Sequence, residues 1–302
     1  MTTEQLIDML RYQDEYNART NGEFWYFGVA NNGKPIIWEL AYCAERAELI
    51  NWYNWKHWVD ERGCKNLGQV KIELTDMWHF VMSKMLELGY LTLVNRILST
   101  IPGFKEPEKR DDIDIREALT KYINDNPEGF KSEREQMYRE IGMAVSMEAS
   151  VNEQKKALMA KAQSVDPNKK ITEADFLTVL INGVIGTTNT LAYEKDKTLQ
   201  TYIMQEFFLL LAMTDLVYKF GIDDLYKYYI GKIALNRLRQ DNGYAETTYK
   251  KHWRLPKADD PTVLEVLEDN DYLVKLVEAE DSALISVDGI YQKLDAEYKK
   301  QN

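Results

Sequence analysis

Apolar residues recur with a period of about 3.6 residues along almost the whole chain, and this pattern constrains the fold more than any other feature. Strict alternation of apolar and polar residues, the mark of a half-buried strand, is scarce. The 302 residues include only 7 prolines and 15 glycines, so few residues interrupt a helix. The pattern predicts an all-α fold, with helices over residues 3–18, 36–61, 68–88, 90–100, 112–125, 131–163, 172–186, 198–220, 222–240, 262–280 and 283–299.

The middle of the chain differs in character from its two ends. A charged, proline-bearing connector, "IPGFKEPEKRDD" (101–112), leads into polar helical sequence that lasts to "SVDPNKK" (164–170). The apolar positions of this sequence form only a narrow stripe, which indicates a helical segment packed on one side. We therefore expect a helical core made of residues 1–100 and 196–302, with residues 101–195 as an appended helical insertion.

Charge and cysteine content exclude several classes of protein. The formal net charge of −11 argues against a general nucleic-acid binder, since such proteins usually present a basic surface. Two cysteines are too few for a disulfide framework. The acid-bearing first helix is unlike a signal peptide, and the longest strongly apolar run, Phe207–Met213, is too short to span a bilayer. We expect a soluble cytoplasmic protein, with no membrane and no nucleic-acid partner.

Two pairs of acidic residues lie at helical spacing near the N-terminal end. Glu45 and Glu48 are three residues apart, as are Glu73 and Asp76 on the next predicted helix. Residues three apart share a helix face, and the short connector 61–69 allows the two helices to lie antiparallel. The four carboxylates can then converge on a cation. Solvated acids on amphipathic helices are an equally good interpretation of the pattern alone.

The types of ligand indicate which metal such a site would hold. Carboxylate oxygens suit Mg²⁺ or Mn²⁺, and no spacing of Cys or His resembles a zinc site. A di-iron site in a helical bundle requires Glu-x-x-His on two helices, and the chain offers only Asp76-x-x-His79. Mg²⁺ or Mn²⁺ is therefore the favoured ion.

A basic stripe lies far downstream, within "YYIGKIALNRLRQDNGYAETTYKKHW" (228–253). Lys232, Asn236 and Arg239 recur at i, i+4 and i+7, which places them on one side of a helix. Asn242-Gly243 then ends the helix, and a loop with further tyrosines and lysines follows. Such an array can hold a polyphosphate, although in isolation an ordinary basic surface stripe is the simpler interpretation.

Four segments in this order resemble the all-α dimeric dUTPases, which are related to phage dCTP pyrophosphatases and MazG-like nucleotide pyrophosphatases. The segments are "MLRYQDEYNARTNG", "CAERAELINWYNWKHW", "KIELTDMWHF" and "YIGKIALNRLRQDNGYAETTYKKHW". The resemblance implies a catalytic helical bundle of the all-α NTP pyrophosphatase type and a homodimer. It also implies two or more Mg²⁺ ions, for which Mn²⁺ can substitute.

The resemblance also assigns roles to residues. It implies that Mg²⁺ is bound by Glu45, Glu48, Glu73 and Asp76, with Glu48 as the general base. It implies phosphate binding by Lys232, Asn236, Arg239, Tyr244 and Lys251. It further implies base binding by Gln13, Asn17, Trp55 and His79. The implied activity is hydrolysis of dUTP, and of dUDP, to dUMP through attack of water at the β-phosphate.

The chain departs from the family pattern at three places in its downstream part. Ile233 stands where an asparagine is common, and Thr247-Thr248 stand where Gly-Ser is common. The tail usually found near "GEDN" after the tryptophan is "RLPKADD" (254–260) here. A pyrophosphatase for dCTP or another nucleotide is one alternative function. A helical protein-interaction module of phage or bacterial origin, without turnover, is the alternative from a different class.

Overall fold

The computed structural model describes residues 1–56, 58–101, 112–193, 198–257, 260, 262–281 and 284–301, of which residues 112–114, 184–193 and 198–202 have a described backbone only. Between its loops, the described part is helical apart from one short antiparallel hairpin and two isolated bridges, so the all-α prediction is confirmed. The α-helices are α1 (Thr3–Asn21), α2 (Trp38–Asn51), α3 (Leu67–Ser99), α4 (Asp112–Asp125), α5 (Pro127–Ala144), α6 (Met147–Val165), α7 (Glu173–Tyr193), α8 (Thr198–Tyr218), α9 (Ile222–Asp241), α10 (Asp269–Ala279) and α11 (Val287–Tyr298). Two single 3₁₀ turns, η1 (Trp25–Phe27) and η3 (Lys299–Gln301), complete the helical elements, and the strands are β1 (His252–Pro256) and β2 (Leu264–Glu268).

The chain divides into two compact units. The larger unit contains Met1, Glu39–Phe80 and Met147–Asn302, and the smaller unit contains Thr2–Trp38 and Val81–Ser146. Helix α3 runs from one unit into the other. These boundaries differ from the expected core of residues 1–100 and 196–302 and the insertion of residues 101–195. That expected division concerns function, and it stays a prediction.

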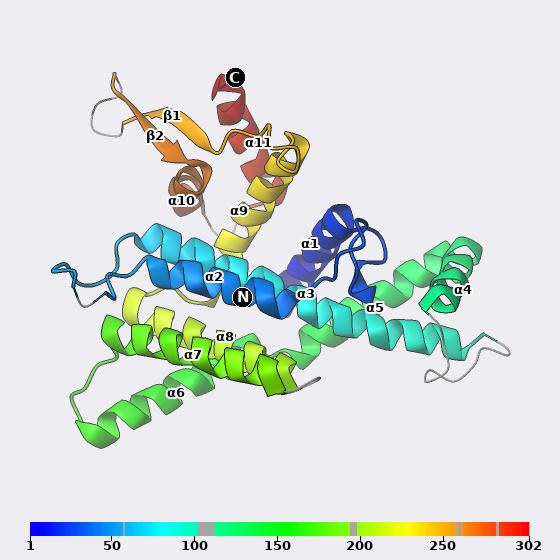
Figure 1. Ribbon diagram of the computed structural model, residues 1–302, viewed down its shortest axis with the longest axis horizontal. Helices are drawn as coiled ribbons and strands as arrows, with labels where there is room; N and C mark the ends of the chain where they lie inside the picture. The colour runs from blue at the N-terminus through cyan, green and yellow to red at the C-terminus, as the bar shows by residue number, and fades with distance from the viewer. Residues whose placement is uncertain are drawn as a thin grey trace. The chain divides into compact units, whose positions relative to one another are not determined.

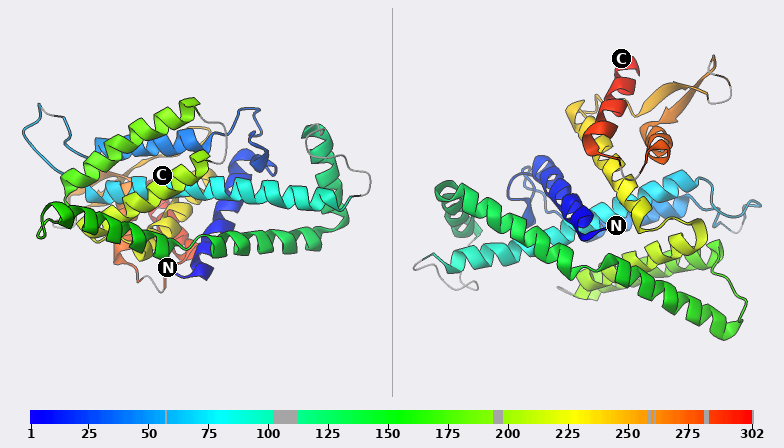
Figure 2. Two further views of the ribbon diagram at one scale, coloured as in Figure 1. Left: turned by 90° about the horizontal axis from the view of Figure 1, so that it is seen from below. Right: turned by 180° about the vertical axis from the view of Figure 1, so that it is seen from behind.

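Two sets of neighbouring helices make up most of the larger unit (Figure 1). Helix α8 packs against both α6 and α7, and the views of Figure 2 show these three helices as one group. Helix α9 packs against α10 and α11, and the hairpin continues from it. Gly231 allows α10 to approach α9, since a Cβ at this position would lie 2.4 Å from Val277 Cγ2. This second group carries the basic stripe.

The smaller unit is built around a buried carboxylate on α1. Asp14 accepts hydrogen bonds from Trp25 Nε1 at 3.1 Å, from the Tyr90 hydroxyl at 2.5 Å, and from the Tyr138 hydroxyl. Helix α5, which supplies Tyr138, is also tied to α1 by an ion pair between Arg11 and Glu135 at 2.7 Å. Helix α5 is thus part of the core of this unit, although it lies within the polar middle of the chain.

The helix boundaries differ from the predicted ones in the first half of the chain. The predicted helices 68–88 and 90–100 are one helix, α3, which continues through Gly89. This glycine has a packing reason, because a Cβ there would lie 2.8 Å from Ile141 Cδ1 of α5. The predicted helix 36–61 is wrong beyond Asn51, where Tyr53 leaves the helix and forms a bridge with Cys64.

Two further helix predictions need correction. The predicted helix 131–163 is divided between α5 and α6, because Val145 leaves the helical region with ψ of 88°. The predicted helix 262–280 begins as strand β2 and becomes helical only at Asp269. The hairpin pairs β1 with β2 from His252↔Glu268 to Pro256↔Leu264, and Trp253 is fully buried on its inner face. The sequence of β2 has a helical pattern, but pairing with the partly buried strand β1 favours the extended conformation there.

None of the helices in the described part of the chain combines the length and apolar character that crossing a bilayer requires. The cytoplasmic location stays a prediction.

Candidate metal and phosphate site

Three carboxylates come together in the larger unit. Helix α2 supplies Glu45, and helix α3 supplies Glu73 and Asp76. One oxygen of each lies within 4.8 Å of the others. Trp52 Nε1 donates a hydrogen bond to Glu73 Oε1 at 3.0 Å, and Lys232 Nζ lies 2.7 Å from Asp76 Oδ2. The two helices therefore converge on one acidic cluster, which we define as Glu45, Glu73 and Asp76.

The acidic cluster holds like charges close together in a partly buried place. Burial, together with the charges of Asp76, Glu73 and Glu48, raises the pKa of Glu45 to about 9, although the Lys232 charge opposes this shift. Burial is also the main cause that raises the pKa of Glu73 to about 7, although the hydrogen bond from Trp52 opposes this shift. Like charges held close together in a partly buried place favour a bound proton or a bound cation.

Glu48 lies on α2 but outside this cluster. Its side chain is exposed, whereas Glu73 is buried. Its negative charge nevertheless raises the pKa of both Glu45 and Glu73, so it lies close enough to act on them. Glu48 is thus a carboxylate on the solvent side of the acidic cluster.

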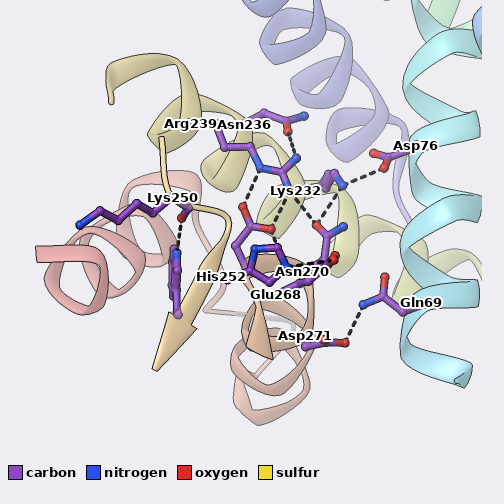
Figure 3. Close-up of polar contacts among 12 residues, drawn as sticks. Gln69, Asp76, Lys232, Asn236, Arg239, Lys250, His252, Glu268, Asn270 and Asp271 are labelled. Atoms are coloured by element: carbon purple, nitrogen blue, oxygen red, sulfur yellow. Dashed lines mark hydrogen bonds and ion pairs between the residues drawn. The ribbon is translucent and has the colours of Figure 1, made fainter. Parts of the chain in front are cut away.

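The basic stripe of α9 faces a second set of acceptors (Figure 3). Arg239 makes a two-pronged contact with Asp269, with Nε and one terminal nitrogen each 2.8 Å from a carboxylate oxygen. Asn270 Oδ1 accepts from the same guanidinium at 3.2 Å and from Lys232 Nζ at 3.1 Å. Lys232 therefore joins Asp76 of the acidic cluster to the start of α10.

The sequence patterns did not indicate that Asp269 and Asn270 belong to the site. The family pattern predicts the "GEDN" tail directly after Trp253, in residues 254–260, whereas Glu268-Asp269-Asn270 follows only after the β1–β2 hairpin. The three letters "EDN" were available as a signal, because they repeat the end of the family's "GEDN" at a displaced position. Asp269 is completely buried, and its contact with Arg239 explains why a carboxylate is present there.

The remaining predicted phosphate ligands lie around the end of α9. Asn236 Oδ1 accepts a hydrogen bond of 3.5 Å from Arg239. The exposed ring of Tyr244 has the Arg239 guanidinium 5.5 Å and the Lys251 ammonium 5.9 Å from its centroid. The structure thus brings all five predicted phosphate ligands into the same part of the larger unit, and their role stays a prediction.

The residues predicted to bind the base are divided between the two units. Gln13 and Asn17 lie buried in the smaller unit, where Gln13 Nε2 donates to Asn17 Oδ1, and both amides donate to Ser83 Oγ, at 3.0 Å in each case. His79 is buried in the larger unit against Tyr229, and burial lowers its pKa to about 4. Trp55 is 43% exposed. The base-binding role of these residues also stays a prediction.

The acidic cluster has the chemical character that a hard divalent cation requires. Its three donors are carboxylate oxygens, which suit Mg²⁺ and Mn²⁺. Burial and the like charges of its members raise the pKa values of Glu45 and Glu73, and a bound cation would relieve both effects. Among the residues that the structure describes, no sulfur or imidazole donor joins the cluster. The residues therefore fit a magnesium site.

Comparison with known proteins adds one finding. The family model described as dUTPase matches residues 5–244, which is most of the chain. The match begins in α1 and ends in the loop after α9, so it contains the acidic cluster and the basic stripe of α9. Among curated proteins, none matches the chain.

Proposed function

Because the chain belongs to the dUTPase family, we propose that it is a Mg²⁺-dependent dUTP diphosphatase, which hydrolyses dUTP and dUDP to dUMP. The observation that carries the proposal is the convergence of Glu45, Glu73 and Asp76 within 4.8 Å, next to the Lys232 ammonium. An acidic cluster beside buried cations suits a substrate that brings a metal ion and phosphates together.

The metal would be held by Glu45, Glu73 and Asp76, with Glu48 as a further ligand. When bound, Mg²⁺ neutralises phosphate charge and orients the phosphates for attack by water. Lys232 is already placed beside Asp76, so its ammonium can hold a phosphate oxygen next to the metal. The contact with Asp269 fixes the Arg239 side chain, and its guanidinium lies over the ring of Tyr244.

Glu48 is the proposed general base. Its exposed carboxylate can accept a proton from the attacking water, while Glu45, Glu73 and Asp76 hold the metal. We propose attack at the β-phosphorus, so that dUMP is the leaving group and pyrophosphate receives the oxygen of water. Lys232, Arg239 and Lys251, together with Asn236 and Tyr244, would hold the phosphates during this step.

Choice of base is assigned to the buried amides of Gln13 and Asn17. Their hydrogen bonds with Ser83 fix the direction of both side chains, and fixed amides accept one arrangement of donors and acceptors. Trp55 and His79 keep the base-binding role that the family resemblance implies for them. We further expect a homodimer in the cytoplasm, with no nucleic-acid partner.

A panel of nucleotides with Mg²⁺ tests the proposed function. Release of dUMP from dUTP and dUDP, suppressed by a chelator, is the expected result. Preferential release of dCMP would move the assignment to a dCTP pyrophosphatase, and the absence of any turnover would contradict an enzymatic function. In ¹⁸O-labelled water the label should enter pyrophosphate, whereas label in dUMP would contradict attack at the β-phosphorus.

A further inference from the structure

The loop between α9 and β1 carries two of the proposed phosphate ligands, Tyr244 and Lys251. Its backbone takes unusual conformations, because Gly243 has φ of 78° and Thr247, which is not a glycine, has φ of 59°. A residue other than glycine in this region adopts a sparsely populated conformation, so the loop needs support from its surroundings. That support comes from the last helix of the chain.

Helix α11 contacts the loop through a buried tyrosine. The hydroxyl of Tyr298 accepts a hydrogen bond from the backbone N–H of Lys250 at 3.3 Å. The ring of Tyr298 stacks on the ring of Tyr249, with centroids 4.9 Å apart and planes 14° apart. Both rings are at least nine-tenths buried. Tyr298 thus contacts the two residues that precede Lys251.

The end of η3 contacts the chain on the other side of Lys251. The side-chain amide of Gln301 accepts from the backbone N–H of Arg254 at 2.7 Å and donates to its carbonyl at 3.3 Å. This pair of bonds takes the place of a neighbouring strand at the outer edge of β1. The carbonyl of Lys251 itself accepts from the backbone N–H of Asp269 at 2.8 Å. The backbone around Lys251 is therefore fixed at three points.

These supports lie beyond the part of the chain that the family model covers. The match ends at residue 244, whereas Asp269, Tyr298 and Gln301 all come later. The lysine side chain is long and flexible, so the region that the Lys251 ammonium can reach is set by the position of the Lys251 backbone. A fixed backbone lowers the entropy that is lost when the ammonium binds a phosphate.

We propose that Tyr298 is a positioning residue that acts through Lys251, holding the Tyr249–Lys250 backbone so that the Lys251 ammonium is ready to bind the phosphates of the nucleotide. This inference rests on the proposed function, since it concerns the same site. It assigns a task to α11 and η3, which are remote in sequence from the residues that the family pattern assigns.

The test is a double-mutant cycle of Tyr298→Phe and Lys251→Ala, read as kcat/KM for dUTP. Tyr298→Phe keeps the stacked ring and removes only the hydrogen-bond acceptor for Lys250. Loss of one such bond corresponds to roughly a threefold to tenfold fall in kcat/KM, mainly through KM. On the Lys251→Ala background the same change should have no further effect, because the residue through which Tyr298 acts is then absent.

Tyr291→Phe is the matched control. Tyr291 lies on the same helix, and its hydroxyl bonds Asp241 at 2.7 Å instead of the loop. Its removal should leave kcat/KM unchanged. A second variant, Tyr298→Leu, removes the stack as well and should raise KM more than Tyr298→Phe does. If this variant is poorly folded by circular dichroism, Tyr298→Phe alone decides.

Two outcomes would overturn the inference. One is a fall in kcat/KM that is equally large with and without Lys251, which would show that Tyr298 acts on stability or on other ligands. The other is no change in Tyr298→Phe. Affinity for inorganic pyrophosphate with Mg²⁺ provides the same cycle without turnover, so an inactive wild type would contradict the proposed function while still allowing this inference to be judged.

Discussion

Each of the two compact units buries carboxylate oxygens, but the two places have opposite balances of donors and acceptors. In the smaller unit the single carboxylate of Asp14 receives hydrogen bonds from an indole and two phenols. Burial and the Asp14 charge raise the pKa values of Tyr90 and Tyr138, so both phenols keep the protons that they donate. In the larger unit the acidic cluster gathers three carboxylates, and the Lys232 ammonium lies beside one of them, Asp76.

This difference in hydrogen-bond donors distinguishes a carboxylate that stabilises the fold from carboxylates that bind a ligand. A buried charge whose hydrogen bonds are all supplied by the protein stabilises the fold, and it has little need of a ligand. Carboxylates that lie close together with too few hydrogen-bond donors repel one another and destabilise the fold until a cation binds. Such a group is therefore typical of a binding or catalytic site. Substitutions at the two places should therefore have opposite consequences.

The largest expected effect is the loss of turnover in Glu48→Gln. The amide keeps the size of the side chain but cannot accept the proton, so kcat should fall by about 10²–10⁴-fold. The melting temperature should stay within about 2 °C of wild type, because Glu48 is exposed. Glu117→Gln, an exposed glutamate on α4, is the control and should have wild-type activity. Near-normal turnover of Glu48→Gln would remove this residue from the chemistry.

The second contrast compares the stabilities of Asp14→Asn and Glu73→Gln without metal. Asp14→Asn removes a charge that three donors share, and should lower the free energy of unfolding by about 2–4 kcal/mol. Glu73→Gln removes a repelling charge and can still accept from Trp52, so metal-free stability should be unchanged or higher. Urea unfolding in a chelator measures both. A large loss of stability in Glu73→Gln would contradict the assignment of this cluster to binding.

The pH dependence of stability follows from the raised pKa values of Glu45 and Glu73. A carboxyl whose pKa is higher in the folded state than in the unfolded state binds more protons when folded, so stability falls as pH rises. Without metal, the free energy of unfolding should fall as the pH rises from about 5 to about 9, through the folded values near 7 and 9. Saturating Mg²⁺ should remove most of this slope. A slope that is the same with and without Mg²⁺ would show that other groups cause it.

The smallest expected effect belongs to Tyr138→Phe. The change removes one donor to Asp14 and leaves the two others, so stability should fall by about 1–2 kcal/mol. Activity at a temperature where the variant is folded should be unchanged. Tyr122→Phe is a matched control, because this tyrosine of α4 bonds the partly exposed Glu133 instead. Equal stability losses in the two variants would contradict the claim that the hydrogen bonds to Asp14 contribute more to stability than a hydrogen bond to a partly exposed carboxylate.

How far the sequence could predict this structure depends on the range of the interactions. The helices follow from a local apolar period, and the spacing of Glu73 and Asp76 on one helix face is also local. The connector that brings Glu45 to them is longer than predicted, because α2 ends at Asn51 and α3 begins at Leu67. The role of α5 could not be predicted in this way. Its polar surface suggested an appendage, whereas Tyr138 fills a place that only the folded unit creates around Asp14.

The start of α10 shows a different limit. Asp269 lies 30 residues after Arg239, and the hairpin between them brings the two together. A local pattern cannot indicate which of many acidic residues meets a given arginine, because that choice is made by tertiary packing. The sequence Glu268-Asp269-Asn270 matches the end of the family motif only if the hairpin is treated as an insertion before it.

Calorimetric titration of the metal-free protein with Mg²⁺ near neutral pH tests the central claim most directly. The acidic cluster should bind Mg²⁺ saturably and release protons on binding, because burial and like charge keep the pKa of Glu45 raised. The Glu45→Gln/Glu73→Gln double variant should lose both the saturable heat and the proton release, whereas Asp14→Asn, titrated below its own melting temperature, should retain them. Saturable binding of equal affinity in the double variant would contradict a metal site at the acidic cluster.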